Sequence, residues 1–241
     1  MERLQKVIAN RGYCSRRHAE ELILNNKVKV NDEIVNVLGT KVDEKDIIEI
    51  NGEVLEEEQK EYYLLNKPRG VITSVKDDKN RKTVVDLIDT NKRIYPVGRL
   101  DYDTTGILLL TNDGELTNML LHPKNEIEKV YIAKIEGIIA VKDINILRSG
   151  VIIDGVKTSR AKVKIKKIDK KDKTSIVELI IHEGKNHQVK KMFQALGYEV
   201  SKLKREKIAF LDLSGLKSGE YRYLNIKEVK QLYNIVKNKK S

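Results

Sequence analysis

Hydrophobic residues follow two different periods along the chain. Near the amino terminus, Leu4, Val7 and Ile8 recur at helical spacing. An amphipathic stretch through residues 19–23 follows Ser15, a residue type that caps the amino termini of helices. We therefore predict two short helices at the start of the chain.

Short strands are predicted next, because valines alternate with polar residues over 28–30 and isoleucines do so over 48–50. The pair Asn31-Asp32 is typical of a turn. The pair Asn51-Gly52 is the strongest two-residue hairpin signal available. These residues indicate a small unit of helices and antiparallel strands.

The segment 56–61, which reads Glu-Glu-Glu-Gln-Lys-Glu, has no apolar periodicity. Such a charged run is typical of a solvated linker that no packing holds in place. We place a domain boundary near residue 60, which divides the chain into a domain of residues 1–60 and a domain of residues 61–241, with mobility between them expected before a ligand binds.

Beyond this segment, strand-like and helical patterns alternate. The runs predicted as strands are 62–65, 71–74, 107–111, 130–135 and 175–182, and those predicted as helices lie near 84–88, 115–121, 190–196 and 226–236. Several strands follow one another with connections too short for a crossover helix. The fold class predicted is α+β, with a mixed, mainly antiparallel sheet flanked by helices.

The composition is that of a packed, charge-rich protein. Of 241 residues, 40% are hydrophobic and 34% are charged. Lys and Arg number 47 against 36 Asp and Glu, and the resulting net charge of +11 favours a polyanionic partner, most simply nucleic acid. The single cysteine, the missing signal sequence and the lack of a long apolar run predict a cytoplasmic protein without membrane contact.

The common catalytic motifs are absent from the sequence. It holds no glycine-rich phosphate loop and no Gly-x-Ser-x-Gly elbow. His182 and His187 are five residues apart instead of the four of a zinc-protease helix, and Gly184 weakens a helix between them. With one cysteine and four scattered histidines in the chain, no catalytic metal is expected.

Basic residues gather near the amino terminus. They are Arg3, Lys6, Arg11, Arg16, Arg17, Lys27 and Lys29. A solvated helix face is the plain interpretation of such a run. However, Arg16 and Arg17 stand at the start of the second predicted helix beside the loop 12–15, where side chains and free backbone N–H groups can hold phosphates.

Four short sequences in this part carry a family resemblance. They are Leu4-Gln5-Lys6-Val7-Ile8-Ala9, Cys14-Ser15-Arg16-Arg17, Ala19-Glu20 and Val28-Lys29-Val30-Asn31. Together they resemble the S4 RNA-binding domain over roughly residues 1–60. The resemblance implies binding of structured RNA through its shape and phosphates, with Lys6, Arg16 and Arg17 in contact with RNA.

A glycine-bracketed loop precedes one predicted strand and reads Gly98-Arg99-Leu100-Asp101-Tyr102-Asp103-Thr104-Thr105-Gly106. In isolation, its aspartates are typical turn residues. With Asn66-Lys67-Pro68-Arg69-Gly70, Tyr95-Pro96-Val97 and Thr111-Asn112-Asp113-Gly114, the loop is similar to the pseudouridine synthases that carry an S4 domain and modify ribosomal RNA. This resemblance covers nearly the whole chain.

The resemblance implies that Asp101 is the essential catalytic residue, with Asp103 as its rival. Converting uridine to pseudouridine requires breaking the bond from N1 to the ribose and rejoining the base through C5. A carboxylate can attack C1′ or remove the C2′ proton, and the sequence leaves both routes open. Because the uridine must leave the stack, Arg99 is expected as a wedge or phosphate contact, with a surface ion pair to Asp103 as the alternative.

Two further motifs of the family are matched. The first is Glu128-Lys129-Val130-Tyr131. A strand tyrosine is usually a core residue. Here the resemblance implies that the ring of Tyr131 stacks on the base and that its hydroxyl serves in proton removal from C5, with Lys129 in contact with RNA.

The other motif is the stretch 183–193, which alone indicates a turn and a helix with a basic face. The resemblance implies that Lys190 pairs with the catalytic aspartate, with Lys191 as a competitor, and that Lys185 and Lys191 contact RNA. Many relatives carry arginine at position 190, and a lysine there gives a single point charge in place of a bidentate fork.

These observations favour a rRNA pseudouridine synthase that needs no cofactor. The likeness to members that modify the large subunit implies one uridine of 23S rRNA, free or in an assembly intermediate, with 16S rRNA as the alternative. A non-catalytic RNA-binding or ribosome assembly factor with the same fold is the competing class. We expect a monomer.

Overall fold

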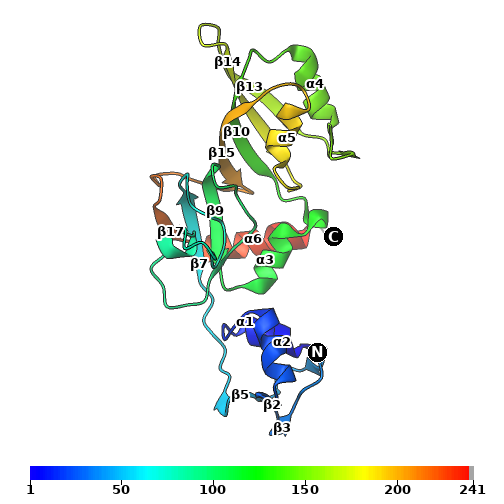
Figure 1. The fold of residues 1–241 in the computed structure, drawn as a ribbon, viewed down its shortest axis with the longest axis vertical. Coiled ribbons are helices and arrows are strands. Elements are labelled where there is room, and N and C mark those ends of the chain that lie inside the picture. Colours follow the sequence, from blue (N-terminus) through cyan, green and yellow to red (C-terminus); the bar gives the residue numbers. More distant parts are fainter. Residues whose placement is uncertain (239–241) are drawn as a thin grey trace. The chain divides into compact units, whose positions relative to one another are not determined.

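The computed structural model describes residues 1–238, which form two compact units (Figure 1). The first unit consists of residues 1–61 together with the short segments 90–94 and 111–114. The second unit holds the remaining described residues. The units are therefore not two consecutive stretches of chain, because two segments beyond residue 61 return to the first unit.

The first unit packs two helices against small sheets. Its elements are β1 (Glu2–Arg3), α1 (Leu4–Asn10), α2 (Arg16–Leu24), β2 (Val28–Val30), β3 (Glu33–Ile34), β4 (Lys41–Val42), β5 (Ile48–Ile50) and β6 (Glu53–Val54). Both predicted helices are confirmed, and the Ser15 hydroxyl accepts a hydrogen bond from His18 N at 3.1 Å. The core includes Leu4, Ile8 and Ile23. The helices thus bury the apolar faces that their spacing predicts.

Both predicted turns join antiparallel strands in this unit. Strand β2 pairs with β3 across Asn31 and Asp32, whose φ values are 51° and 65°. Strand β5 pairs with β6 across Asn51 and Gly52, at 52° and 86°. Positive φ at both central residues is the requirement of the type I′ turn, which explains the choice of Asn, Asp and Gly.

The segment 56–61 differs from the predicted solvated linker. The side chain of Asn112 donates to Glu58 Oε2 at 2.9 Å and to the carbonyl of Gln59 at 3.0 Å, and it accepts from Glu61 N at 2.8 Å. Lys60 donates to the carbonyl of Asn10 at 2.6 Å. The prediction that nothing holds this segment was wrong, because its partners lie far away in the sequence.

The second unit is built on one large sheet, whose strand order is β13-β14-β10-β15-β9-β7-β17 (Figure 1). Its strands are β7 (Tyr62–Lys67), β8 (Tyr95–Pro96), β9 (Thr105–Thr111), β10 (Lys129–Glu136), β13 (Lys162–Asp169), β14 (Thr174–Ile181), β15 (Val200–Ile208), β16 (Leu211–Asp212) and β17 (Tyr221–Tyr223), with a separate hairpin of β11 (Ile152–Ile153) and β12 (Val156–Lys157). Strands β13, β14, β10 and β15 pair antiparallel, whereas β15 and β9 are parallel. The predicted α+β class with a mainly antiparallel sheet is confirmed.

Helices cover this sheet. They are α3 (Gly114–Leu121), α4 (Val141–Ser149), α5 (Gln188–Gln194) and α6 (Ile226–Asn238), with 3-10 turns at η1 (Val85–Leu87) and η2 (Pro123–Asn125). Leu116 of α3 and Leu232 of α6 share a core with Ile107 and Leu109 of β9. Among residues 1–238, no helix combines the length and the apolar content that crossing a membrane requires.

Two predicted elements are wrong. Residues 71–74 form no strand, and only Ile72 makes an isolated bridge, to Thr83. The hydroxyl of Thr73 donates to the carbonyl of Leu100 at 2.6 Å, and the hydroxyl of Ser74 donates to the carbonyl of Lys76. Side chains thus bind backbone carbonyls that a strand would pair with backbone N–H groups. The helix predicted near 84–88 is only the turn η1.

Gly106 lets strand β9 approach β15. Its φ is +110°, and a Cβ there would lie 2.1 Å from the carbonyl oxygen of Arg205. We expect Gly106→Ala to lower the free energy of unfolding by about 3 kcal/mol, because positive φ and a backbone clash add. At Gly155, φ is +76° and a Cβ would meet nothing within 4 Å, so Gly155→Ala should cost only about 1 kcal/mol. Equal losses in denaturant titrations would contradict this account.

Candidate active site

A buried lysine binds backbone carbonyls of the loop that carries Asp101. Lys67, at the end of β7, has no exposed surface. Its Nζ donates to the carbonyls of Pro68, Asp101 and Thr104 at 3.1, 3.1 and 3.0 Å. Burial lowers the pKa of Lys67 to about 8, although the charges of Asp101 and Asp103 oppose the shift. One ammonium group therefore fixes the loop backbone at Asp101 and at Thr104.

The Asp101 carboxylate is partly exposed, at 26%, and has two nitrogen partners. Lys190 Nζ lies 3.4 Å from one oxygen, and His187 Nε2 lies 3.4 Å from the other. Both partners come from the amino-terminal end of α5. The side chain is thus reachable from solvent and oriented by a second element of the unit.

Lys190 serves two carboxylates. It donates its short hydrogen bond, of 2.6 Å, to Asp103 Oδ1, and this bond lowers the pKa of Asp103. The structure contains the predicted ion pair, with Lys190 Nζ 3.4 Å from Asp101 Oδ2, but the carboxylate of Asp103 is closer to Lys190. A lysine can do this because its three donors have no fixed fork.

A cavity of about 470 Å³ opens beside Asp101. Its walls include Asp101, Arg99, Lys129, Tyr131, Lys185 and Arg205, and Asp103 is not among its lining residues. Tyr131, on β10, is only 8% exposed, and its hydroxyl accepts from Arg205 Nη1 at 3.5 Å. The cavity therefore brings together the two residues expected to act on the uridine, and it distinguishes Asp101 from Asp103.

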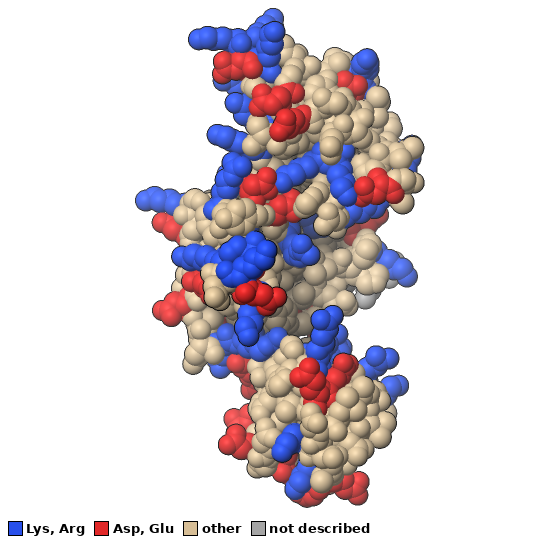
Figure 2. Space-filling model, in the orientation of Figure 1, with Lys and Arg blue, Asp and Glu red and all other residues tan. Residues whose placement is uncertain are grey.

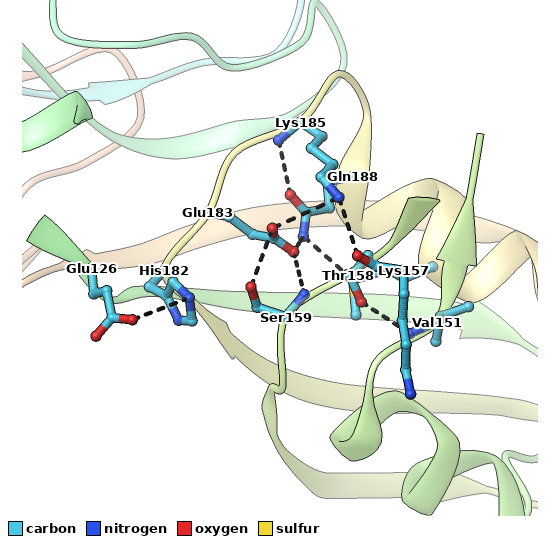
Figure 3. Close-up of polar contacts among 10 residues, drawn as sticks. Glu126, Val151, Lys157, Thr158, Ser159, His182, Glu183, Lys185 and Gln188 are labelled. Atoms are coloured by element: carbon cyan, nitrogen blue, oxygen red, sulfur yellow. Dashed lines mark hydrogen bonds and ion pairs between the residues drawn. The ribbon is translucent and has the colours of Figure 1, made fainter. Parts of the chain in front are cut away.

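The loop between β14 and α5 is fixed by Glu183 (Figure 3). This carboxylate accepts from Ser159 N at 2.9 Å and from Gln188 Nε2 at 2.6 Å. Gln188, which is 3% exposed, accepts from Lys185 N at 2.8 Å. His187 takes a left-handed conformation there, with φ of 51°. These contacts determine where the loop presents His187 to Asp101.

The two adjacent lysines of α5 have different environments. Lys190 reaches the aspartates, whereas Lys191 pairs with Asp154. Neighbouring helix positions are about 100° apart around the axis, so only one of the two lysines can point toward the aspartates. Lys191 does not compete with Lys190 for Asp101.

The other residues expected to bind RNA are spread over both units. Arg99 is exposed, and no ion pair with Asp103 occurs among the residues described. Lys185 lies 3.8 Å from Glu183. In the first unit, Arg16 and Arg17 are exposed at the start of α2, and Lys6 pairs with Glu2. Figure 2 shows Lys and Arg spread over the visible face, with acidic side chains between them.

The sequence gives no indication of a role for three residues of the candidate site, which are Lys67, His187 and Arg205. His187 was considered only for zinc, where its spacing fails. Lys67 lies in a motif that carried the resemblance, but nothing in the sequence indicates that its ammonium group reaches three carbonyls. Arg205 lies in a strand that was not predicted, and no local signal marks it.

The chain is similar to known proteins over most of its length. The family model described as RNA pseudouridylate synthase matches residues 61–195, and the S4 domain model matches residues 2–48. The ribosomal large subunit pseudouridine synthase B of Bacillus subtilis is 55% identical over 96% of both chains. The dual-specificity RNA pseudouridine synthase RluF of Escherichia coli is 34% identical, over 99% of this chain and 81% of that one. A crystal structure of a pseudouridylate synthase aligns with a TM-score of 0.68 and 34% identity, over 96% of this chain and 100% of that one.

Proposed function

The chain belongs to the RNA pseudouridylate synthase family, and from that premise we propose that it isomerises one uridine of 23S ribosomal RNA to pseudouridine. The observation that carries the proposal is the cavity wall shared by Asp101 and Tyr131, with Lys190 3.4 Å from the Asp101 carboxylate. The choice of 23S rRNA draws on the 55% identity to a large subunit synthase. Such a substrate implies action in the cytoplasm.

Asp101 acts at the ribose in this scheme. Its carboxylate either forms a bond to C1′ or takes the C2′ proton as the bond from C1′ to N1 breaks. The turned base then rejoins C1′ through C5. In the same step the bond from the carboxylate to C1′ breaks, or the carboxyl group returns its proton to C2′, so Asp101 is regenerated. In the final step C5 loses its proton and N1 gains one, so the reaction is a net isomerisation. Lys190 positions the carboxylate and balances its charge.

Basic side chains supply the binding energy for RNA. Eversion of a nucleotide costs a few kcal/mol, which contacts elsewhere on the RNA must provide. Arg99 lies at the cavity mouth as a wedge or phosphate contact, and Lys185 and Lys191 extend the basic surface along the loop and α5. In the first unit, Lys6, Arg16 and Arg17 are the proposed contacts to structured RNA.

Transcribed 23S and 16S rRNA incubated separately with the protein test the proposal. Pseudouridine mapping should find one new site in 23S rRNA and none in 16S rRNA. If naked 23S rRNA is not modified, large-subunit particles from cells that lack the protein are the next substrate. Tight, salt-dependent binding without pseudouridine in either form would instead support an assembly factor.

The Tyr131 hydroxyl is expected to matter for turnover. Tyr131→Phe retains the ring in the wall but removes the group 3.5 Å from Arg205. We expect the unfolding temperature and RNA affinity to stay near those of the parent, and the single-turnover rate to fall by about 100-fold, the scale of a lost general acid–base. An unchanged rate would exclude the hydroxyl from proton transfer.

A further inference from the structure

Arg205 is a buried cation in the wall of the cavity. It lies on β15 and is 3% exposed. Its Nε donates to the carbonyl of Ile107 at 2.9 Å, and Nη1 lies 3.5 Å from the Tyr131 hydroxyl. Its Nη2 is buried and has no hydrogen-bond partner within the described chain. Each hydrogen bond that this guanidinium group makes within residues 1–238 is therefore accepted by a carbonyl or a hydroxyl oxygen, and none by a carboxylate.

Lys129 is a second cation in the same wall. Its Nζ donates to the carbonyls of Ile127 and His182 at 3.2 and 3.1 Å. Burial lowers the pKa of Lys129 to about 8, and the charge of Arg205 adds to this shift, which indicates that the two cations influence each other.

Neither cation is neutralised by the protein. No carboxylate lies within 4 Å of Lys129 or Arg205 among residues 1–238. The two carboxylates of the cavity wall have other partners, since Asp101 meets Lys190 and His187, and Glu183 meets Gln188 and Ser159. A buried arginine beside a half-buried lysine, with no counter-charge for either, is costly, so the site is organised for an anion.

The geometry points to Arg205 and Lys129 as catalytic residues that stabilise the uracil anion while it is detached from the ribose. This inference rests on the proposed function and names the charge that the cavity must hold. A phosphate of the RNA backbone is a poorer occupant, because an arginine that is 3% exposed lies too deep for a chain of nucleotides, whereas an everted base enters the cavity.

The reaction supplies such an anion in either route for Asp101. When the bond from C1′ to N1 breaks, its electron pair remains on the base. The detached uracil then carries one negative charge, shared among N1, C5 and the two carbonyl oxygens. The charge disappears when C5 bonds to C1′ and the proton from C5 is replaced by one on N1. Cations placed in advance in the cavity wall favour this state over bound uridine.

The test measures the parent and an Arg205 variant on two substrates that differ only in the target base. Arg205→Gln keeps a donor for the Ile107 carbonyl but removes the charge. The substrates are one 23S rRNA fragment with uridine and the same fragment with 5-fluorouridine at the target position, because fluorine withdraws electrons and stabilises the uracil anion. Consumption of the target nucleoside is measured in single turnover by nuclease digestion and mass spectrometry.

We expect Arg205→Gln to slow uridine consumption by about 100- to 1000-fold, the scale of a lost oxyanion donor, relative to the parent. The deficit should be at least about fivefold smaller on 5-fluorouridine, and Arg205→Lys should restore part of the rate. Arg148→Gln is the matched control, because Arg148 also donates to a backbone carbonyl, that of Val163, but does not line the cavity.

The outcomes separate the inference from the proposed function. An Arg205→Gln variant that folds and shows the same deficit on both substrates, or none, would overturn the anion role. If this variant does not fold, Lys129→Gln is subjected to the same comparison, and equal deficits would again overturn it. A parent that consumes neither substrate would overturn the proposed function, and the inference with it.

Discussion

Replacing Asp101 by asparagine is expected to abolish pseudouridine formation. The amide keeps the size of the side chain but can neither bond to C1′ nor accept the C2′ proton, so we expect a loss of at least about 1000-fold in the single-turnover rate. RNA affinity should stay within about twofold of the parent, because a carboxylate does not attract phosphates and its replacement removes no favourable contact to RNA. Product formation on a 23S rRNA fragment and filter binding measure the two quantities.

Asp103→Asn is the matched control for this change. Asp103 accepts the short hydrogen bond from Lys190 but does not line the cavity. We expect its rate to fall by no more than about tenfold, since Lys190 keeps its neighbour Asp101. Equal product from the parent and Asp101→Asn, or a larger loss in Asp103→Asn, would remove Asp101 from its role.

Replacing Lys67 by methionine should produce the largest loss of stability. The variant leaves the carbonyls of Pro68, Asp101 and Thr104 without their shared donor. A buried acceptor that loses its partner costs about 1–3 kcal/mol, and relief of the buried charge offsets part of the sum. We expect a loss of about 4 kcal/mol in the free energy of unfolding at pH 7, measured by urea titration.

The Lys67→Met comparison also has a defined pH dependence. The folded pKa of Lys67 is about 8, below the value of about 10.4 for an unfolded lysine. Between these values the unfolded parent binds more protons than the folded one, so the parent gains stability as pH rises. The difference between parent and Lys67→Met should therefore widen from pH 8 to pH 10.

Lys162→Met provides the control for both measurements. Lys162 is exposed, and its ion pair with Glu128 lies at the surface. Such pairs contribute little, so the stability change should stay within about 0.5 kcal/mol at every pH. If the stability difference between the parent and Lys67→Met narrows as pH rises, the lowered pKa of buried Lys67 is contradicted.

Local signals explain which parts of the fold were predictable from the sequence. The helix cap at Ser15 and the turn at Asn51-Gly52 depend on residues that are adjacent in the chain, so their patterns suffice. Helix α4 was missed because its cap position, Ala140, offers no side-chain bond. Strand β13 was missed because its sequence is dominated by lysines, which are poor strand formers.

The candidate site also contains residues that local sequence signals reveal and residues that they do not. Asp101, Tyr131 and Lys190 were found through motifs, and the structure brings them to one cavity or its edge. The residues that no motif indicated make their contacts to residues far away in the sequence. Lys67 reaches a loop more than thirty residues away, and Arg205 contacts the carbonyl of Ile107, 98 positions earlier. Only tertiary packing creates such contacts, so composition and spacing do not encode them locally.

The parallel pairing of β9 with β15 has a consequence for biosynthesis. Thr105 and Gly106 meet Lys204 and Arg205, which are translated about a hundred codons later. Contacts over such a separation form slowly and only when both partners have left the exit tunnel. A nascent chain that ends before residue 200 therefore displays Asp101 without the strand that supports its loop. Premature termination between codons 110 and 200 should leave a polypeptide that still carries the S4 domain but is devoid of activity.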